Sequence, residues 1–119
     1  MKDDLLYIDH VIETSETIAS YIADVLFDDF ESNGMLYDAV IRNLQVLSES
    51  TQKISLRIKE KYEDIPWKSL SGFRNILVHD YLEGINPVVV WNVVVRDLPM
   101  LYENFLIMRD ELQRTSHST

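Results

Sequence analysis

One short stretch of the chain holds the side chains best suited to chemistry. It reads Gly72-Phe73-Arg74-Asn75-Ile76-Leu77-Val78-His79-Asp80-Tyr81. Arginine carries a fixed fork of hydrogen-bond donors that matches a phosphate group. Histidine is the side chain that most readily gains and loses a proton near neutral pH. Arg74 and His79 could therefore hold an anionic group and transfer a proton beside it.

Helical geometry limits how these residues can act together. At about 100° per residue, Asn75 and His79 share a face, whereas Arg74 and His79 lie about 140° apart. We expect Arg74 and His79 to converge only on a ligand across the helix end, or in a cleft completed by a second copy of the chain. The apolar face of the same helix consists of Leu70, Phe73, Ile76 and Leu77. Val78 projects away from that face, so it needs a cover from another helix or a second copy.

Roles without catalysis are also open for both residues. His79 near a helix C-terminus would interact favourably with the helix dipole when protonated. Arg74 could form an ion pair with Asp80 or Glu83, which follow it closely in the sequence. Composition alone does not decide between these roles and catalysis.

Other candidate sites have less support. The chain has no cysteine, which excludes disulfides, thiolate zinc sites and a cysteine nucleophile. His10 and Glu13 share a helix face but lack the several carboxylates of a di-iron site. Asp24, Asp28 and Asp29 fit a solvated face. Neither a glycine-rich phosphate loop nor the elbow motif of serine hydrolases occurs, so we expect no metal and no cofactor.

The net charge of −9 resides in the first part of the chain. Residues 1–41 carry ten acidic side chains and one basic one, and the remainder is neutral. Residues 42–74 hold seven basic side chains against four acidic ones, so a nucleic-acid ligand fits only this second part. No apolar run approaches a membrane span, and the first residues are acidic where a signal peptide is basic. We expect a cytoplasmic protein that binds neither DNA nor membrane.

The pattern of apolar residues predicts an all-α fold. With three glycines and three prolines, the chain has few turns and therefore long elements. Apolar positions three and four apart predict helices over about 4–30, 35–62 with a bend at 48–52, 66–78 and 87–112. We expect a single helical domain over 1–113, an antiparallel bundle of four or five helices, followed by a polar, frayed tail over 114–119.

Capping residues mark several expected boundaries. Gly34 is suited to a left-handed turn that ends the first helix, and Asp64 to the N-cap of the third, with Pro66 in its first turn. Asn86 and Pro87 are suited to the start of the fourth helix. The valine-rich residues 88–95 have strand propensity, but no partner strand is expected elsewhere, so they are assigned to this helix.

A second proline interrupts the last helix. Pro99 should kink this helix or split it in two, with Asp97 as a fresh N-cap. This choice decides whether the bundle has four helices or five.

The reactive stretch resembles the Arg-x4-His-x-Tyr motif of HEPN-domain toxins. Arg74, His79 and Tyr81 occupy the three defined positions of that motif. The longer string from Phe73 to Tyr81 is similar to the signature of the HepT family, the toxin half of the type VII HepT–MntA toxin–antitoxin module. Other recurring patches of the family resemble Trp67, Val90-Trp91 and Asp97-Leu98-Pro99, so the likeness spans nearly the whole chain.

The resemblance implies a homodimeric, metal-independent endoribonuclease acting on RNA such as tRNA or mRNA. RNA supplies its own nucleophile, the 2′-hydroxyl group. His79 would be the general base or acid, Arg74 would stabilise charge on the phosphate, and Asn75 would be a supporting polar group. The resemblance further implies that an MntA-like minimal nucleotidyltransferase neutralises the toxin by attaching AMP to Tyr81.

Two other interpretations stay open. In the first, the protein is a non-catalytic helical dimer that binds a nucleotidyltransferase partner, and the Tyr81 loop is only a docking and modification surface. In the second, the chain is a structural helical adaptor. The overall acidity favours the first slightly over a ribonuclease, since RNA binding then depends on a local basic surface.

Overall fold

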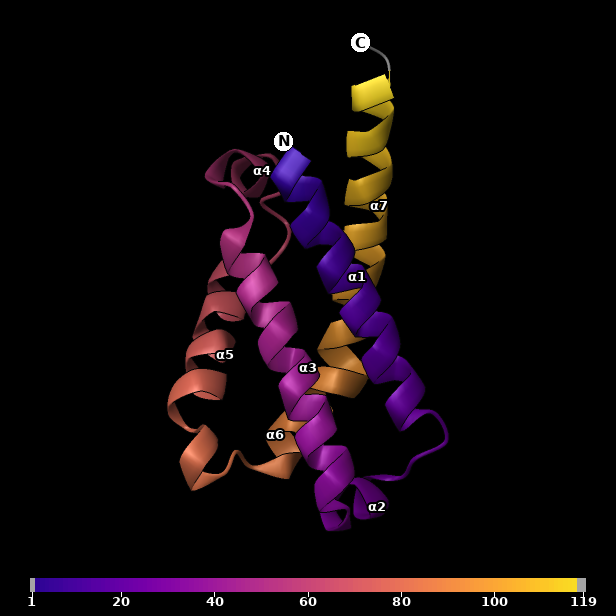
Figure 1. Cartoon of the computed structure of the whole chain (residues 1–119), viewed down its shortest axis with the longest axis vertical. Helices are drawn as coiled ribbons and strands as arrows, with labels where there is room; N and C mark the ends of the chain where they lie inside the picture. The colour runs from indigo at the N-terminus through magenta and orange to yellow at the C-terminus, as the bar shows by residue number, and fades with distance from the viewer. Residues whose placement is uncertain (1, 118–119) are drawn as a thin grey trace.

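The computed structural model describes residues 2–117 and places most of them in helices (Figure 1). The elements are α1 (Lys2–Ile22), α2 (Phe27–Ser32), α3 (Gly34–Lys53), α4 (Leu56–Lys61), α5 (Trp67–His79), the 3₁₀ turn η1 (Tyr81–Glu83), α6 (Pro87–Asn92), the π turn η2 (Val93–Asp97) and α7 (Leu98–His117). The described residues contain no β-strand, which confirms the all-α class. Successive long helices α1, α3, α5 and α7 run in alternating directions, as in an antiparallel bundle.

The α3 helix occupies the centre of the bundle. It packs against α1 on one side and α5 on the other, and α1 in turn packs against α7. The buried core includes Ile8, Val11 and Ile12 of α1, Val40, Ile41 and Leu44 of α3, Leu77 of α5, and Phe105 and Met108 of α7. Burial of these apolar side chains is the main force that holds the helices together. No helix in the described part of the chain combines the length and apolar character that crossing a membrane requires.

The expected first helix over 4–30 is wrong, because the chain turns after Ile22. Asp24 adopts a left-handed conformation with φ of 60°, and a separate short helix, α2, begins at Phe27. The turn carries Phe30 into the core, where its ring centroid lies 5.1 Å from that of Trp91. Core packing therefore overrides the helical periodicity of the local sequence.

The junction between α2 and α3 also differs from expectation. Gly34 is the first residue of α3 and does not form a left-handed turn. Asn33 caps α3, since its side-chain oxygen accepts a hydrogen bond from the backbone N–H of Leu36 at 3.1 Å. Asparagine is a favoured N-cap residue, so Asn33 marks this boundary and the expectation for Gly34 is wrong.

The expected long helix over 35–62 is broken at residues 54–55, not bent at 48–52. The carboxylate of Asp4 in α1 accepts hydrogen bonds from the backbone N–H and the hydroxyl of Ser55, both at 2.8 Å. The Ser55 hydroxyl also caps α4 by accepting a hydrogen bond from the N–H of Ile58. A contact between residues 51 positions apart thus separates α3 from α4.

Two expected helix starts have different outcomes. α5 begins at Trp67 with Pro66 as its N-cap residue, so Asp64 does not cap it. Asn86 does cap α6, because its side-chain oxygen accepts a hydrogen bond from the N–H of Val88 at 2.9 Å and Pro87 is the first helical residue. The helical assignment of the valine-rich segment is confirmed.

Pro99 does not split the last helix, and Asp97 is not an N-cap. The segments α6, η2 and α7 follow one another without a break, with Val93 and Leu98 in right-handed helical conformation. Proline lacks the N–H that a regular helix needs, and the wider π turn directly before it accommodates this loss. The α7 helix continues to His117, through most of the expected tail, and residues 118–119 lie outside the described part.

Candidate active site

The α5 helix presents the predicted site residues on its outer side. Leu77 is fully buried, whereas Val78 has 47% of its surface exposed, as its position between Arg74 and Asn75 predicts. Ile76, expected on the apolar face, is exposed as well, because α5 packs mainly against α3. The end of α5 therefore shows apolar side chains to solvent beside polar ones.

Arg74 is held by an acidic residue of the central helix. Its Nε donates a hydrogen bond to the Glu49 carboxylate at 2.7 Å, and the two side chains are 33% and 44% exposed. Asp80 and Glu83, the partners considered from the sequence, form no ion pair with Arg74. Glu49 is thus a site residue that the sequence analysis missed, since it lies 25 positions earlier and only the packing of α3 on α5 brings it close.

Asn75 lies against Arg74. Its side-chain oxygen accepts a hydrogen bond from Nη1 of Arg74 at 3.4 Å, which is long for such a contact. The structure therefore brings Glu49, Arg74 and Asn75 together, and it joins Asn75 to the arginine instead of the histidine.

His79 is the last residue of α5 and is exposed. Its ring makes no hydrogen bond or ion pair with any residue that the structure describes. Nor do the described residues contain a group of three or more histidine, aspartate or glutamate side chains placed to hold a metal ion. The imidazole is consequently open to a ligand from solvent or from another molecule.

The loop after α5 is fixed by a tyrosine of α3. The hydroxyl of Tyr37 donates a hydrogen bond to the carbonyl oxygen of Ile85 and accepts one from the N–H of Ile85 at 3.1 Å. Burial raises the pKa of Tyr37, which keeps its hydroxyl proton available for donation. Gly84, with φ of 89°, gives the preceding turn a conformation that other residues rarely adopt.

Tyr81 belongs to this anchored loop. It lies in η1, two residues after His79, and exposes 45% of its surface. Its hydroxyl makes no hydrogen bond within the described residues. The Tyr81 side chain is thus partly exposed to solvent, while the loop that carries it is tied to α3 at Ile85.

Removal of the anchoring hydroxyl should loosen the loop. Tyr37→Phe leaves the N–H and carbonyl of buried Ile85 without their partner, so the free energy of unfolding should fall by about 1–2 kcal/mol. Urea unfolding measures this change, and amide hydrogen exchange at Ile85 should become faster. Tyr7→Phe is the matched control, because the partly buried Tyr7 hydroxyl makes no hydrogen bond in the described part of the chain. Equal destabilisation by both variants would contradict the anchoring role.

Two of the hollows in the described part of the chain are mainly apolar and lie outside this arrangement. A largely apolar groove of about 810 Å³ separates α5 from η2 and α7, with Phe73 and Ile76 on one wall and Met100 on the other. Arg74, Asn75, His79 and Tyr81 do not line it. The groove can accept apolar side chains, but none of the predicted site residues lines it.

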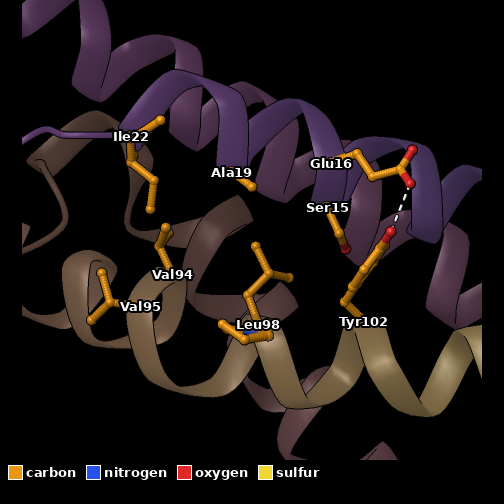
Figure 2. Close-up of a pocket in the computed structure, with 10 residues that line it drawn as sticks. Ser15, Glu16, Ala19, Ile22, Val94, Val95, Leu98 and Tyr102 are labelled. Atoms are coloured by element: carbon orange, nitrogen blue, oxygen red, sulfur yellow. Dashed lines mark hydrogen bonds between the residues drawn. The ribbon is translucent and has the colours of Figure 1, made fainter.

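The second hollow, of about 550 Å³, lies between α1 and the start of α7 (Figure 2). Ala19 faces Val94 and Leu98 across it, and the Tyr102 hydroxyl donates a hydrogen bond to the Glu16 carboxylate at 2.7 Å. This hydrogen bond raises the pKa of Tyr102. No histidine, arginine or lysine lines the hollow, so it offers neither a phosphate-binding cation nor an imidazole.

A comparison with protein families identifies the family of the chain that carries this site. A family model described as "Ribonuclease HepT-like" matches residues 11–106, which include all of α5 and the loop after it. The chain belongs to the HepT-like ribonuclease family. The resemblance seen around Arg74, His79 and Tyr81 therefore holds for most of the chain.

Several proteins similar in sequence to this HepT-like chain have names that include a ribonuclease. A Methanocaldococcus jannaschii protein named as a gamma-glutamylcyclotransferase and putative RNase is 35% identical over 98% of this chain, which spans about half (52%) of that relative. A "Putative RNase" of Caldanaerobacter subterraneus subsp. tengcongensis is 28% identical over 85% of this chain and 89% of the relative. A "Probable ribonuclease HepT" of Thermococcus cleftensis is 30% identical over 87% of this chain and 93% of the relative. No solved structure matches the chain significantly.

Proposed function

We propose that this protein is a metal-independent endoribonuclease that uses Arg74 and His79. The observation that carries the proposal is the state of Arg74, whose Nε is held by Glu49 while its terminal nitrogens keep donors for a phosphate. His79 stands exposed at the end of the same helix. Membership of the HepT-like ribonuclease family supports RNA as the substrate.

The proposed reaction uses the nucleophile that RNA carries. The ribose 2′-oxygen bonds to the adjacent phosphorus, and the bond from phosphorus to the 5′-oxygen of the next nucleotide breaks. His79 removes the proton of the 2′-hydroxyl or supplies one to the departing 5′-oxygen. Arg74 stabilises the charge that builds up on the phosphoryl oxygens, and Asn75 supports Arg74. The products are a 2′,3′-cyclic phosphate and a 5′-hydroxyl.

A homodimer would supply what one chain lacks. Each turnover needs both a base and an acid, while one copy contributes a single histidine in this stretch. Exposed apolar side chains also occur on the end of α5, on η1 and on α6: Ile76, Val78, Leu82, Val88 and Val89. A twofold arrangement would cover them and bring two motifs to one cleft.

Light scattering at tens of micromolar should therefore give about twice the 13.9 kDa mass of one chain. Val78→Asp places a charge in the covered apolar contact, so it should yield a monomer with weaker cleavage. Ile107→Asp is the matched control, because Ile107 is 58% exposed but lies on α7. A monomeric wild-type protein that cleaves RNA would contradict the shared cleft.

The test of the activity is RNA cleavage without metal. Purified, unmodified protein is incubated with tRNA and with total RNA in EDTA, beside the double variant Arg74→Ala/His79→Ala. We expect wild type alone to release fragments that end in a 2′,3′-cyclic phosphate, and RNA with 2′-deoxyribose at the cleaved position to resist. Cleavage that requires a divalent metal, or that persists in the double variant, overturns the proposal.

We propose further that the enzyme is the toxin of a type VII module in the cytoplasm, silenced by an MntA-like minimal nucleotidyltransferase. The 45% exposure of Tyr81 supports this role, because an incoming enzyme can reach a side chain that is partly exposed. AMP attached there would bring an anionic phosphodiester close to the motif. It would repel RNA and compete for the donors of Arg74.

The alternative is a non-catalytic helical dimer that binds the same nucleotidyltransferase. The net charge of −9 favours it, because RNA binding draws on positive charge. This alternative predicts modification of Tyr81 with no cleavage of RNA in EDTA.

A further inference from the structure

We propose that Glu49 is a positioning residue that orients Arg74 for phosphate stabilisation. The inference rests on the proposed ribonuclease activity and adds a residue that lies outside the Arg74-to-Tyr81 stretch. Glu49 would not touch the substrate, and its effect on the reaction would pass through the guanidinium of Arg74.

The geometry of the ion pair suits this role. Glu49 binds Arg74 through Nε alone, at 2.7 Å. The two terminal nitrogens of a guanidinium form its second donor edge, which can bind two oxygens of one phosphate. Of these nitrogens, Nη1 makes only the long 3.4 Å contact with Asn75. The carboxylate thus fixes the side chain by the edge that a phosphate does not need.

The helix that carries Glu49 is itself fixed against α5. On one side of the pair, Gln52 and Ser71 exchange two hydrogen bonds, at 3.0 Å and 3.1 Å. On the other side, the amide of Gln45 donates a hydrogen bond to the carbonyl oxygen of Leu77 at 3.3 Å. Glu49 therefore lies in the middle of three polar contacts between α3 and α5, which we call the α3–α5 ladder. Loss of any one of these contacts leaves the register of the two helices to the other two and to the apolar packing between them, whereas only Glu49 holds Nε of Arg74.

Because Glu49 is negatively charged, kcat and KM can distinguish a role in positioning Arg74 from a role in binding RNA. A carboxylate beside the phosphate site repels RNA, so its removal should not weaken RNA binding. Loss of orientation should instead lower the rate of the chemical step, because a misplaced catalytic group can cost about 10²-fold in rate. Glu49→Ala is therefore expected to lower kcat by about 10–100-fold while KM stays the same or falls. Glu49→Gln keeps an oxygen acceptor for Nε, so it should recover most of kcat.

The experiment compares four proteins with one RNA substrate in EDTA: wild type, Glu49→Ala, Glu49→Gln and Gln52→Ala. Steady-state kinetics give kcat and KM, and thermal unfolding reports the fold. Gln52→Ala is the matched control, because it removes a neighbouring contact of the α3–α5 ladder without touching Arg74. We expect Gln52→Ala to retain kcat within about threefold. Gln52 is half-buried, so its replacement should change stability little, and the ion pair of Arg74 stays in place.

Each outcome decides the matter. A lower kcat confined to Glu49→Ala, with rescue by Glu49→Gln, supports the positioning role. An unchanged or higher kcat in Glu49→Ala overturns it, since Glu49 would then be irrelevant or would compete with RNA for Arg74. Equal losses in Glu49→Ala and Gln52→Ala overturn it as well, because the contact would be structural. Absence of cleavage in the wild type overturns the ribonuclease proposal itself, and the role of Glu49 falls with it.

Discussion

Replacement of His79 by alanine should remove RNA cleavage and leave the helical fold intact. General acid or base catalysis contributes about 10²–10⁴-fold to a rate, so the variant should fall below toxic activity in cells. His79 is exposed and ends its helix, so the free energy of unfolding should change by no more than about 0.5 kcal/mol. Cleavage assays and circular dichroism measure the two effects. His10→Ala is the control, because it removes a histidine of α1 that lies outside the motif, and this variant should cleave RNA normally.

Arg74→Ala should have an effect of similar size for a different reason. It removes the cation beside the phosphate, and loss of one such donor costs about 10²–10³-fold in rate. Arg109→Ala is a close control, because Arg109 is 34% exposed, against 33% for Arg74, and forms its own ion pair with Asp9 at 3.1 Å.

The paired controls make the result decisive. If Arg109→Ala and Arg74→Ala reduce cleavage equally, the loss reflects a general ion-pair effect and the catalytic role fails. A loss of helical circular dichroism in Arg74→Ala or His79→Ala would assign that residue a structural role instead.

Tyr81→Phe should keep most of the ribonuclease activity and escape neutralisation. The hydroxyl has no part in the proposed proton transfers, yet it is the atom to which AMP would be attached. The variant should therefore stay toxic when a nucleotidyltransferase is co-expressed, whereas the wild type should become harmless. Mass spectrometry of the co-expressed wild type should show whole AMP units on the peptide that holds Tyr81.

A second tyrosine tests whether exposure alone attracts the modification. Tyr21 is 41% exposed, against 45% for Tyr81, but lies on α1. Tyr21→Phe should be neutralised like the wild type. If Tyr81→Phe is inactive by itself, Tyr81 takes part in catalysis and the division between cleavage and control is wrong.

Local signals predicted much of the fold. The order of the helices follows from apolar residues at helical spacing, and the start of α6 follows from Asn86 and Pro87, whose capping contacts span only two residues. The breaks were missed because their causes are distant. Ser55 is bound by Asp4, 51 positions away, and the turn at Asp24 is set by the burial of a later aromatic ring.

In the candidate site, too, the features set by local sequence were predicted and those set by distant contacts were not. The motif places Arg74 and His79 on one helix, and the exposure of Val78 follows from helical periodicity alone. The expected partners of Arg74, Asp80 and Glu83, are its near neighbours in the sequence, whereas Glu49 reaches it only because α3 packs against α5. A pairing between helices is not encoded in the spacing of residues within either one.

The π turn η2 has a consequence for how the length of the chain can vary. A π turn takes up one residue more than the α-helical turn it replaces, so η2 behaves as an absorbed insertion. Deletion of one residue within Val93–Asp97, in a chain that also lacks Pro99, would restore a regular helix and still leave Val90 and Phe105 facing the core. Addition of one residue would instead rotate all of α7 by about 100° and turn Phe105 toward solvent. Homologous chains should therefore differ in length here by a single lost residue, not by a gained one.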